Sequence, residues 1–207
     1  MDLSPLPITG SFYQQQQQQV PFFYCYSPSV IPKPDDWSEW THVTGYWFLD
    51  SPSNWQPPKE LVDFLESGEP PVYIGFGSMR SADPQALTKL ILAALERTGR
   101  RGIILTGWGA LSNTDLPKNI FQVSSIPHNW LFPKMAAVVH HGGSGTTSAG
   151  LRAGVPSIIV PFGADQPFWG QVVAAKGIGP TAIPQKQLTV DKLATAIETA
   201  LGSEEMK

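Results

Sequence analysis

The stretch His-His-Gly-Gly-Ser-Gly-Thr-Thr, residues 140–147, places two histidines, three glycines and three hydroxyl groups in one short segment. An apolar run precedes it and a helical pattern follows it, so we expect a turn from a strand into a helix. Glycines expose successive backbone N–H groups at such a helix start, where the helix dipole adds partial positive charge. This turn suits a phosphate, although its glycine spacing matches neither the G-x-G-x-x-G fingerprint nor the P-loop.

The two histidines are neighbours at the end of an expected strand, so their side chains point to opposite faces. A shared metal ion is therefore not expected. One ring should pack or hydrogen-bond within the sheet, and we expect His141, next to the turn, to face the ligand.

Two further loops carry small or polar residues after expected strands. In the first, Gly77 allows backbone to approach a ligand closely and Ser78 offers a hydroxyl donor, although a tight turn that needs glycine is the simpler interpretation. The second ends in Asp165 and Gln166, an acid beside an amide, which together can hold vicinal sugar hydroxyls. Asp165 could equally cap the helix that follows. The three loops together indicate a sugar joined to a diphosphate.

The elements that must position these loops begin at about residue 59, where helical and strand patterns start to alternate. The expected helices span 58–68, 83–99, 144–153, 166–177 and 189–201, with a short turn-helix at 127–134. The expected strands span 71–79, 101–108, 120–126, 136–141 and 155–162. This alternation predicts an α/β fold, a Rossmann-like parallel sheet with helices on both faces that binds ligands beyond the carboxyl ends of its strands.

The first part of the chain has a different composition. Residues 1–21 include six consecutive glutamines and are expected to be a low-complexity, disordered segment. Residues 22–58 are rich in proline and tryptophan, which predicts an irregular linker. Residues 59–207 form the expected ligand-binding domain, in a chain of 207 residues that is long enough for one good-sized domain.

Composition narrows the function classes. The net charge of −3 provides no basic face for nucleic acid. Cys25 is the only cysteine, which excludes an intrachain disulfide and a thiolate metal cluster. The sequence shows neither an apolar run of roughly 18 residues nor a secretory signal pattern. We therefore expect a soluble protein in the cytoplasm.

Three segments, taken in order, carry a resemblance to a known family: GFGSM, IPHNWLFPK and VVHHGGSGTTSAGLRAGVPSIIVPFGADQPFWG. They resemble the donor-binding half of UDP-sugar glycosyltransferases and are most similar to sterol 3-β-glucosyltransferases, with a match over about residues 22–205. The resemblance implies the GT-B fold, in which two Rossmann-like domains face each other across a cleft. It also implies inverting transfer of glucose from UDP-glucose to the 3-hydroxyl of a membrane sterol.

The resemblance also implies roles for individual residues. The diphosphate would contact Gly77, Ser78, His141, Gly143, Gly145 and Thr146. The glucose hydroxyls would contact Asp165 and Gln166. The uracil would lie by Ser125, Ile126 and Pro127. Two positions differ from the plant small-molecule members of the family. Those members place a tryptophan against the uracil where this chain has Ser125, so Trp130 does not take that role. They carry a ribose-binding glutamate where this chain has Ala149.

The resemblance implies that a preceding acceptor domain supplies the sterol pocket and the catalytic base, and that residues 22–58 hold only its tail and the linker. The candidate bases within the chain are His42, His128, Asp35 and Asp36, and none is assigned. An Asp-x-Asp pair does not occur, so neither a metal nor another cofactor is indicated beside the donor substrate. The expected partners are UDP-glucose, a sterol or lipid acceptor with peripheral membrane contact, and a complementary acceptor-domain chain.

Two other function classes stay open at this point. A non-catalytic module could hold the UDP-sugar without turning it over, because the acceptor part and the base are not evident in the sequence. A nicotinamide-dependent oxidoreductase is disfavoured, because the glycine spacing is wrong and no acidic residue follows at the required distance.

Overall fold

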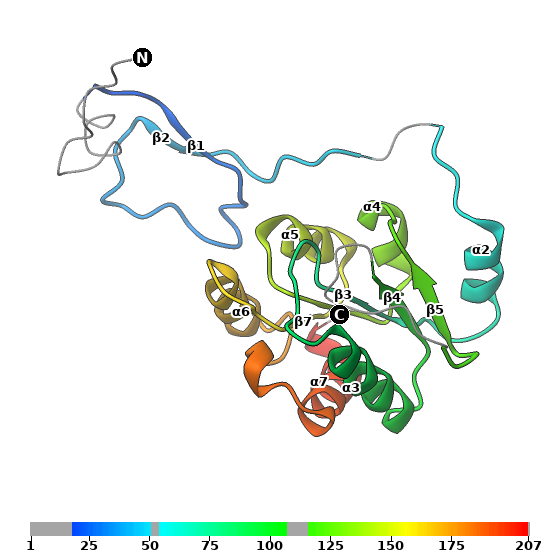
Figure 1. Cartoon of the computed structure of the whole chain (residues 1–207). Helices are drawn as coiled ribbons and strands as arrows, with labels where there is room; N and C mark the ends of the chain where they lie inside the picture. Colours follow the sequence, from blue (N-terminus) through cyan, green and yellow to red (C-terminus); the bar gives the residue numbers. More distant parts are fainter. Residues whose placement is uncertain (1–17, 51–53, 107–115, 207) are drawn as a thin grey trace, which may run out of the picture. The chain divides into compact units, whose positions relative to one another are not determined.

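The structure is a computed structural model that describes residues 18–50, 54–106 and 116–206. Its elements are β1 (Phe22–Tyr24), β2 (Thr41–Val43), α2 (Lys59–Glu66), β3 (Val72–Gly75), α3 (Pro84–Arg97), β4 (Gly102–Leu105), β5 (Ile120–Val123), α4 (His128–Leu131), η1 (Phe132–Lys134), β6 (Ala137–His140), α5 (Ser144–Ala153), β7 (Ser157–Ile159), α6 (Gln166–Ala175), η2 (Gln185–Gln187), α7 (Val190–Gly202) and η3 (Glu204–Met206) (Figure 1). The chain divides into two compact units: the first ends at Leu49 and the second begins at Asp50.

The second unit is built on a five-stranded sheet with the order β5-β4-β3-β6-β7, and every neighbouring pair is parallel. Figure 1 shows α3 and α7 on one side of this sheet and α2, α4 and α5 on the other. Parallel sheets need cover on both faces because their strands are apolar on both sides. The predicted Rossmann-like α/β fold is therefore confirmed.

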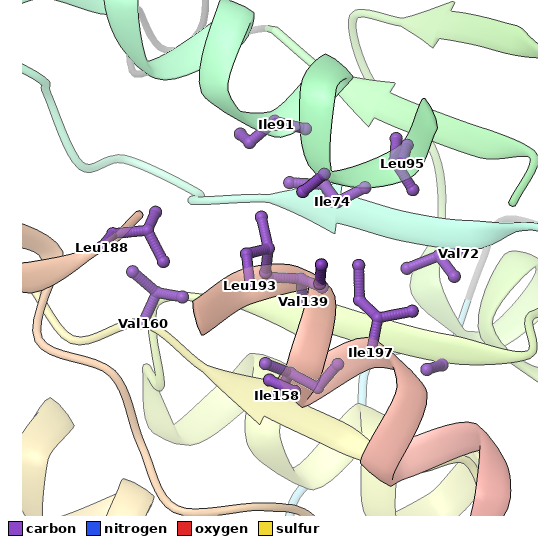
Figure 2. Packing of buried hydrophobic residues seen from close by; sticks show 14 of the residues in the cluster. Val72, Ile74, Ile91, Leu95, Val139, Ile158, Val160, Leu188, Leu193 and Ile197 are labelled. Atoms are coloured by element: carbon purple, nitrogen blue, oxygen red, sulfur yellow. The ribbon is translucent and has the colours of Figure 1, made fainter. Parts of the chain in front are cut away.

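Side chains that alternate along the strands form two cores. On one face, Ile74 and Val139 pack against Ile91 of α3 and Ile197 of α7, and all four are fully buried (Figure 2). The second core, on the opposite face, joins strand residues to α2, α4 and η1; its buried members are Leu61, Tyr73, Ile103, Val123, Ile126, Leu131, Phe132, Met135 and Val138. These two cores fix the strands, and thereby the loops at their ends.

Local signals determine where the long helices begin and end. The Asp83 carboxylate accepts a hydrogen bond from the Ala86 N–H at 2.9 Å, which caps α3 just before Pro84. The Thr189 hydroxyl caps α7 in the same way, through the Lys192 N–H at 3.2 Å. At the end of α5, Gly154 takes the left-handed conformation with φ +66°. The helices predicted from the sequence are present, and the strands are shorter than predicted.

The strand order creates a switch point. From β3 the chain crosses to β4 and β5 on one side, and it then returns to β6 and β7 on the other side of β3. The loops after β3 and β6 therefore leave the sheet in opposite directions. Ligands of doubly wound sheets bind in the crevice that this divergence opens at the carboxyl edge.

The first unit contains a feature that the sequence did not predict. Residues 22–58 were expected to be irregular, yet β1 and β2 pair in parallel, with Phe23 opposite His42. A strand of three residues is too short to show an alternating pattern, which is why the pairing was missed. Cys25 is exposed there. The predicted glutamine-rich N-terminus lies mostly outside the described residues, as do the end of the predicted strand at 101–108 and residues 51–53 of the predicted linker.

Candidate functional site

Three loops meet at the carboxyl edge of the sheet because they follow the adjacent strands β3, β6 and β7. We name them the β3 loop (residues 76–79), the β6 loop (residues 141–143) and the β7 loop (residues 160–165). Each loop contains residues predicted to bind the ligand. The geometry below shows which of these residues lie together.

His141 occupies a slot between the β3 loop and the start of α5. A Cβ atom added to Gly77 would lie 2.8 Å from Cε1 of the His141 ring, and one added to Gly143 would lie 2.4 Å from its Nε2. Real side-chain atoms do not approach this closely, so both positions must be glycine for the ring to fit. Gly77 also has φ +56°, which favours glycine independently. His141 and Gly77, predicted to serve one site, are therefore adjacent.

The two histidine rings differ in their surroundings. The rings of His140 and His141 are 6.3 Å apart with an interplanar angle of 81°. His140 is fully buried, whereas His141 lies at the crevice and is 8% exposed. Nδ1 of His141 has no hydrogen-bond partner among the described residues. A buried, unpaired nitrogen at a ligand crevice is available to a phosphate oxygen.

The first turn of α5 presents backbone donors to the same crevice. Gly143 is the residue before the helix and provides no side-chain cap. Of the predicted contacts that follow, Gly145 is exposed and Thr146 is half-buried. Thr147 differs: its hydroxyl is buried and donates to the Gly143 carbonyl at 3.0 Å. The hydroxyl available to a ligand from this pair is that of Thr146.

The β7 loop directs Asp165 into the site. Its carboxylate accepts a hydrogen bond from the Trp169 indole N–H at 3.0 Å, so it does not cap α6. Asp165 is exposed. Burial lowers the pKa of His141, and the negative charge of Asp165 opposes this shift. The exposed carboxylate keeps further lone pairs that can accept a hydrogen bond from a hydroxyl group.

Gln166 is placed differently from the sequence prediction. It is 4% exposed, and its Oε1 accepts from the backbone N–H groups of Phe162 and Gly163 at 2.7 and 3.1 Å. Its Nε2 donates to Sδ of Met79 at 3.1 Å. The amide thus ties the β7 loop to the β3 loop. This arrangement favours a structural role for Gln166 within the loops, and the direct sugar contact predicted for it has no support in this geometry.

The loop between β5 and α4 carries the predicted uracil contacts. Ser125 is exposed, Pro127 is half-buried and Ile126 packs into the second core. The next residue is His128, which the sequence indicated only as a candidate base. It stacks on Phe132 with ring centroids 4.3 Å apart, and its charge is coupled to that of His141. The signal available in the sequence was the position of His128 directly after a predicted contact segment.

All three histidines of the second unit favour the neutral form. Burial lowers the pKa of His140 to about 3 and that of His128 to about 4, and repulsion from His141 adds to both shifts. Burial also lowers the pKa of His141, while Asp165 opposes this effect. At neutral pH the site therefore presents a neutral imidazole, which can donate one hydrogen bond and accept another.

Ala164 has a strained backbone at the tip of the β7 loop, with φ +54°. Left-handed conformations are costly for residues with a Cβ atom, and such strain is often found at binding sites. Ala164→Gly should therefore raise the free energy of unfolding by about 1 kcal/mol in urea denaturation. Ala93→Gly, in the interior of α3, is the control and should lower the free energy of unfolding by about 1 kcal/mol. A decrease in both variants would contradict the strain at residue 164.

The other candidate bases belong to the first unit. His42 stacks on Phe23 at 5.3 Å in the first unit, and Asp35 and Asp36 are exposed there. A catalytic base is therefore not assigned. Within residues 18–50, 54–106 and 116–206, no group of three or more His, Cys, Asp or Glu residues is arranged to hold a metal ion. No helix in these same segments is long and apolar enough to cross a membrane.

Comparison with known sequences identifies similar proteins. Two sterol 3-beta-glucosyltransferases of Arabidopsis thaliana, UGT80A2 and UGT80B1, are 49% and 47% identical to the chain over 189 and 206 residues. These matches cover 91% and 99% of the chain but 30% and 33% of the relatives. A sterol 3-beta-glucosyltransferase of Aspergillus fumigatus is 44% identical over 93% of the chain and 14% of that relative. The chain thus spans about a third or less of the length of these relatives.

Solved structures share the fold at lower identity. The glycosyltransferase of kitacinnamycin matches 90% of the chain and 48% of its own length, with a TM-score of 0.72 and 19% identity. Arabidopsis thaliana UGT89C1, solved in complex with UDP, matches 73% of the chain and 40% of its own length, with a TM-score of 0.59 and 23% identity. These likenesses identify the fold as that of GT-B glycosyltransferases.

A family model provides the assignment. The model for the C-terminal domain of erythromycin biosynthesis protein CIII-like proteins matches residues 91–207, which is more than half of the chain. This segment contains the β6 and β7 loops, α5 and α6. The chain therefore belongs to the erythromycin biosynthesis protein CIII-like C-terminal domain family.

Proposed function

We propose that the chain is the donor-binding half of a hexosyltransferase that transfers glucose from UDP-glucose, with inversion, to the hydroxyl group of a sterol or similar lipid. The observation that carries the proposal is the convergence on His141, whose ring lies between Gly77 and Gly143 and beside Asp165. In this proposal, phosphate contacts and a sugar contact surround the same histidine. The names of the sterol glucosyltransferase relatives support glucose as the donor sugar and a sterol as the acceptor.

The chemistry requires stabilisation of a leaving group. The acceptor oxygen attacks C1 of glucose, the bond from C1 to the diphosphate oxygen breaks, and UDP leaves with additional negative charge. The N-terminus of α5, the Thr146 hydroxyl and the His141 imidazole can stabilise that charge without a metal ion. The acceptor proton must pass to a base, which we expect in the acceptor half of the enzyme. The proposed reaction uses no cofactor other than the donor substrate.

The first unit supports the idea of a complementary acceptor half. Among its described residues, Thr41 is the only buried one, and Phe23 and Trp47 are 57% and 68% exposed. Two parallel strands without a core are not stable alone, because parallel sheets need cover on both faces. We propose that an acceptor domain, in the same polypeptide or in another chain, completes this ribbon. We further propose that the protein acts in the cytoplasm with peripheral contact to sterol-containing membranes.

The proposed site is tested by titrating the protein with UDP and with UDP-glucose in a calorimeter. His141→Ala should lower the affinity for both ligands by about tenfold, because a hydrogen bond to a charged group contributes roughly 1.5–3 kcal/mol. Asp165→Asn keeps an acceptor for the Trp169 indole but removes the negative charge. It should therefore lower the affinity for UDP-glucose about tenfold and leave the affinity for UDP nearly unchanged. Asp63→Asn, an exposed position on α2, is the matched control for loss of charge.

The outcome separates the open function classes. Equal weakening of both ligands by Asp165→Asn would refute the sugar assignment. Binding of UDP-glucose without sterol glucoside formation by the same preparation would indicate a binding module. A preference for NADH over UDP-glucose would instead support an oxidoreductase.

A further inference from the structure

His140 makes one specific side-chain contact that the proposed ligand contacts do not explain. Its ring is fully buried, and Nδ1 accepts a hydrogen bond from the Gly142 N–H at 3.1 Å. The ring proton therefore lies on Nε2, and this atom has no hydrogen-bond partner among the described residues. The His140 side chain thus hydrogen-bonds to the backbone two residues ahead, at the centre of the β6 loop.

The Gly142 backbone needs such support because its conformation is unusual. Its φ is +89°, and a Cβ atom at this position would lie 2.7 Å from Cγ2 of Ile159 and 3.1 Å from the Gln166 carbonyl oxygen. Only glycine fits here, and glycine is also the residue with the most alternative conformations. A bond from the side chain of residue i to the N–H of residue i+2 has the form of an Asx turn, which restricts that freedom.

His140 is itself firmly anchored. Its carbonyl oxygen accepts from the Val160 N–H at 2.8 Å, which joins the end of β6 to the β7 loop. Its neighbour His141 follows directly in the slot between the two glycines. The turn at Gly142 therefore determines both the direction of the His141 ring and the direction of the first amides of α5.

We propose that His140 is a positioning residue of the diphosphate site: its Nδ1 holds the Gly142 amide, and this bond orients His141 and the first turn of α5 toward the ligand. The proposal rests on the proposed function for the identity of the ligand. In this proposal His140 contacts no ligand itself and influences the site through the backbone of the β6 loop.

A space-filling role for His140 makes a different prediction. A ring that only fills the core could be replaced by leucine with no effect on the β6 loop, whereas the positioning role requires an acceptor at the Nδ1 position. Burial lowers the pKa of His140, so the ring stays neutral at physiological pH and its Nδ1 lone pair can accept, as the positioning role requires.

Three substitutions separate these roles. In His140→Asn the Oδ1 atom takes the place of Nδ1, so the bond to the Gly142 amide is kept. In His140→Gln the carboxamide lies one bond further out, at the Nε2 position, and in His140→Leu no acceptor is present. We expect UDP dissociation constants within about threefold of the native value for the Asn variant and about tenfold higher for the Gln and Leu variants. Equal affinities of the Asn and Gln variants, or native affinity of the Leu variant, would overturn the proposal.

Two measurements do not depend on UDP binding. Amide hydrogen exchange at Gly142 should stay slow in the native protein and the Asn variant and become faster in the Gln variant. In the native protein alone, long-range ¹⁵N–¹H spectra of labelled histidine should show His140 with its proton on Nε2, and a proton on Nδ1 would overturn the proposal. If the native protein does not bind UDP, the proposed function fails, while these two measurements still decide the role of His140.

Discussion

Gly143→Ala should lower the affinity for UDP by about tenfold, as His141→Ala does, because the added methyl group takes the space of the His141 ring. The new Cβ atom would lie 2.4 Å from Nε2 of His141, and the ring cannot move away because Gly77 closes the slot on its other side. Gly143 has φ −64° and ψ 141°, an ordinary conformation for alanine, so the substitution adds no backbone strain. The loss should therefore come from displacement of the ring.

A double variant tests this cause directly. In the His141→Ala background the ring is absent, so Gly143→Ala should add little further loss of UDP affinity. Such non-additivity is expected when two substitutions act on the same contact. Gly202→Ala, at the end of α7 with no neighbour within 4 Å of the added atom, is the matched control and should bind UDP normally. Additive losses in the double variant would show that Gly143 acts independently of His141.

The second large effect is a loss of stability in mild acid. The pKa values of His140 and His128 in the folded protein are about 3 and about 4, below the usual histidine value near 6.5. Between these folded values and pH 6.5 the unfolded chain binds more protons than the folded protein, so stability rises with pH in this window and falls as the pH is lowered. Above pH 7 these histidines make no further contribution to the pH dependence.

When the pH is lowered from 7 to 5, each of the two buried rings should lower the free energy of unfolding by about 2 kcal/mol, or about 4 kcal/mol together. Urea denaturation at both pH values measures this difference. His140→Asn removes one titrating group and should reduce the difference to about half. Equal pH dependence in the native protein and the His140→Asn variant would contradict burial of the neutral ring.

The sequence predicted features that depend on local signals. Asp83, Pro84 and Gly99 marked the ends of α3, and the alternation of patterns identified the parallel sheet. The three ligand loops were also predicted, because each follows a strand and the carboxyl ends of parallel strands lie at one edge. The sequence also predicted that His140 and His141 point to opposite faces, because side chains alternate along a strand.

Other features depend on contacts between segments that are far apart in the sequence. The slot for His141 requires Gly77, which lies 64 residues earlier in the chain, and no local pattern connects them. The sequence could not show that the Gln166 amide turns inward, because its partner Met79 belongs to another loop. His128 was weighed only as a base, since its proximity to His141 arises from the packing of α4 against the sheet.

The exposed Cys25 of the first unit has a practical consequence. Because it is the only thiol in the sequence, a maleimide fluorophore would attach at one known position beside the β1–β2 ribbon. Covering of that ribbon by an acceptor domain would shield the dye from water and from a soluble quencher. A change in quenching on mixing would thus report the docking of the proposed acceptor domain without any assay of catalysis.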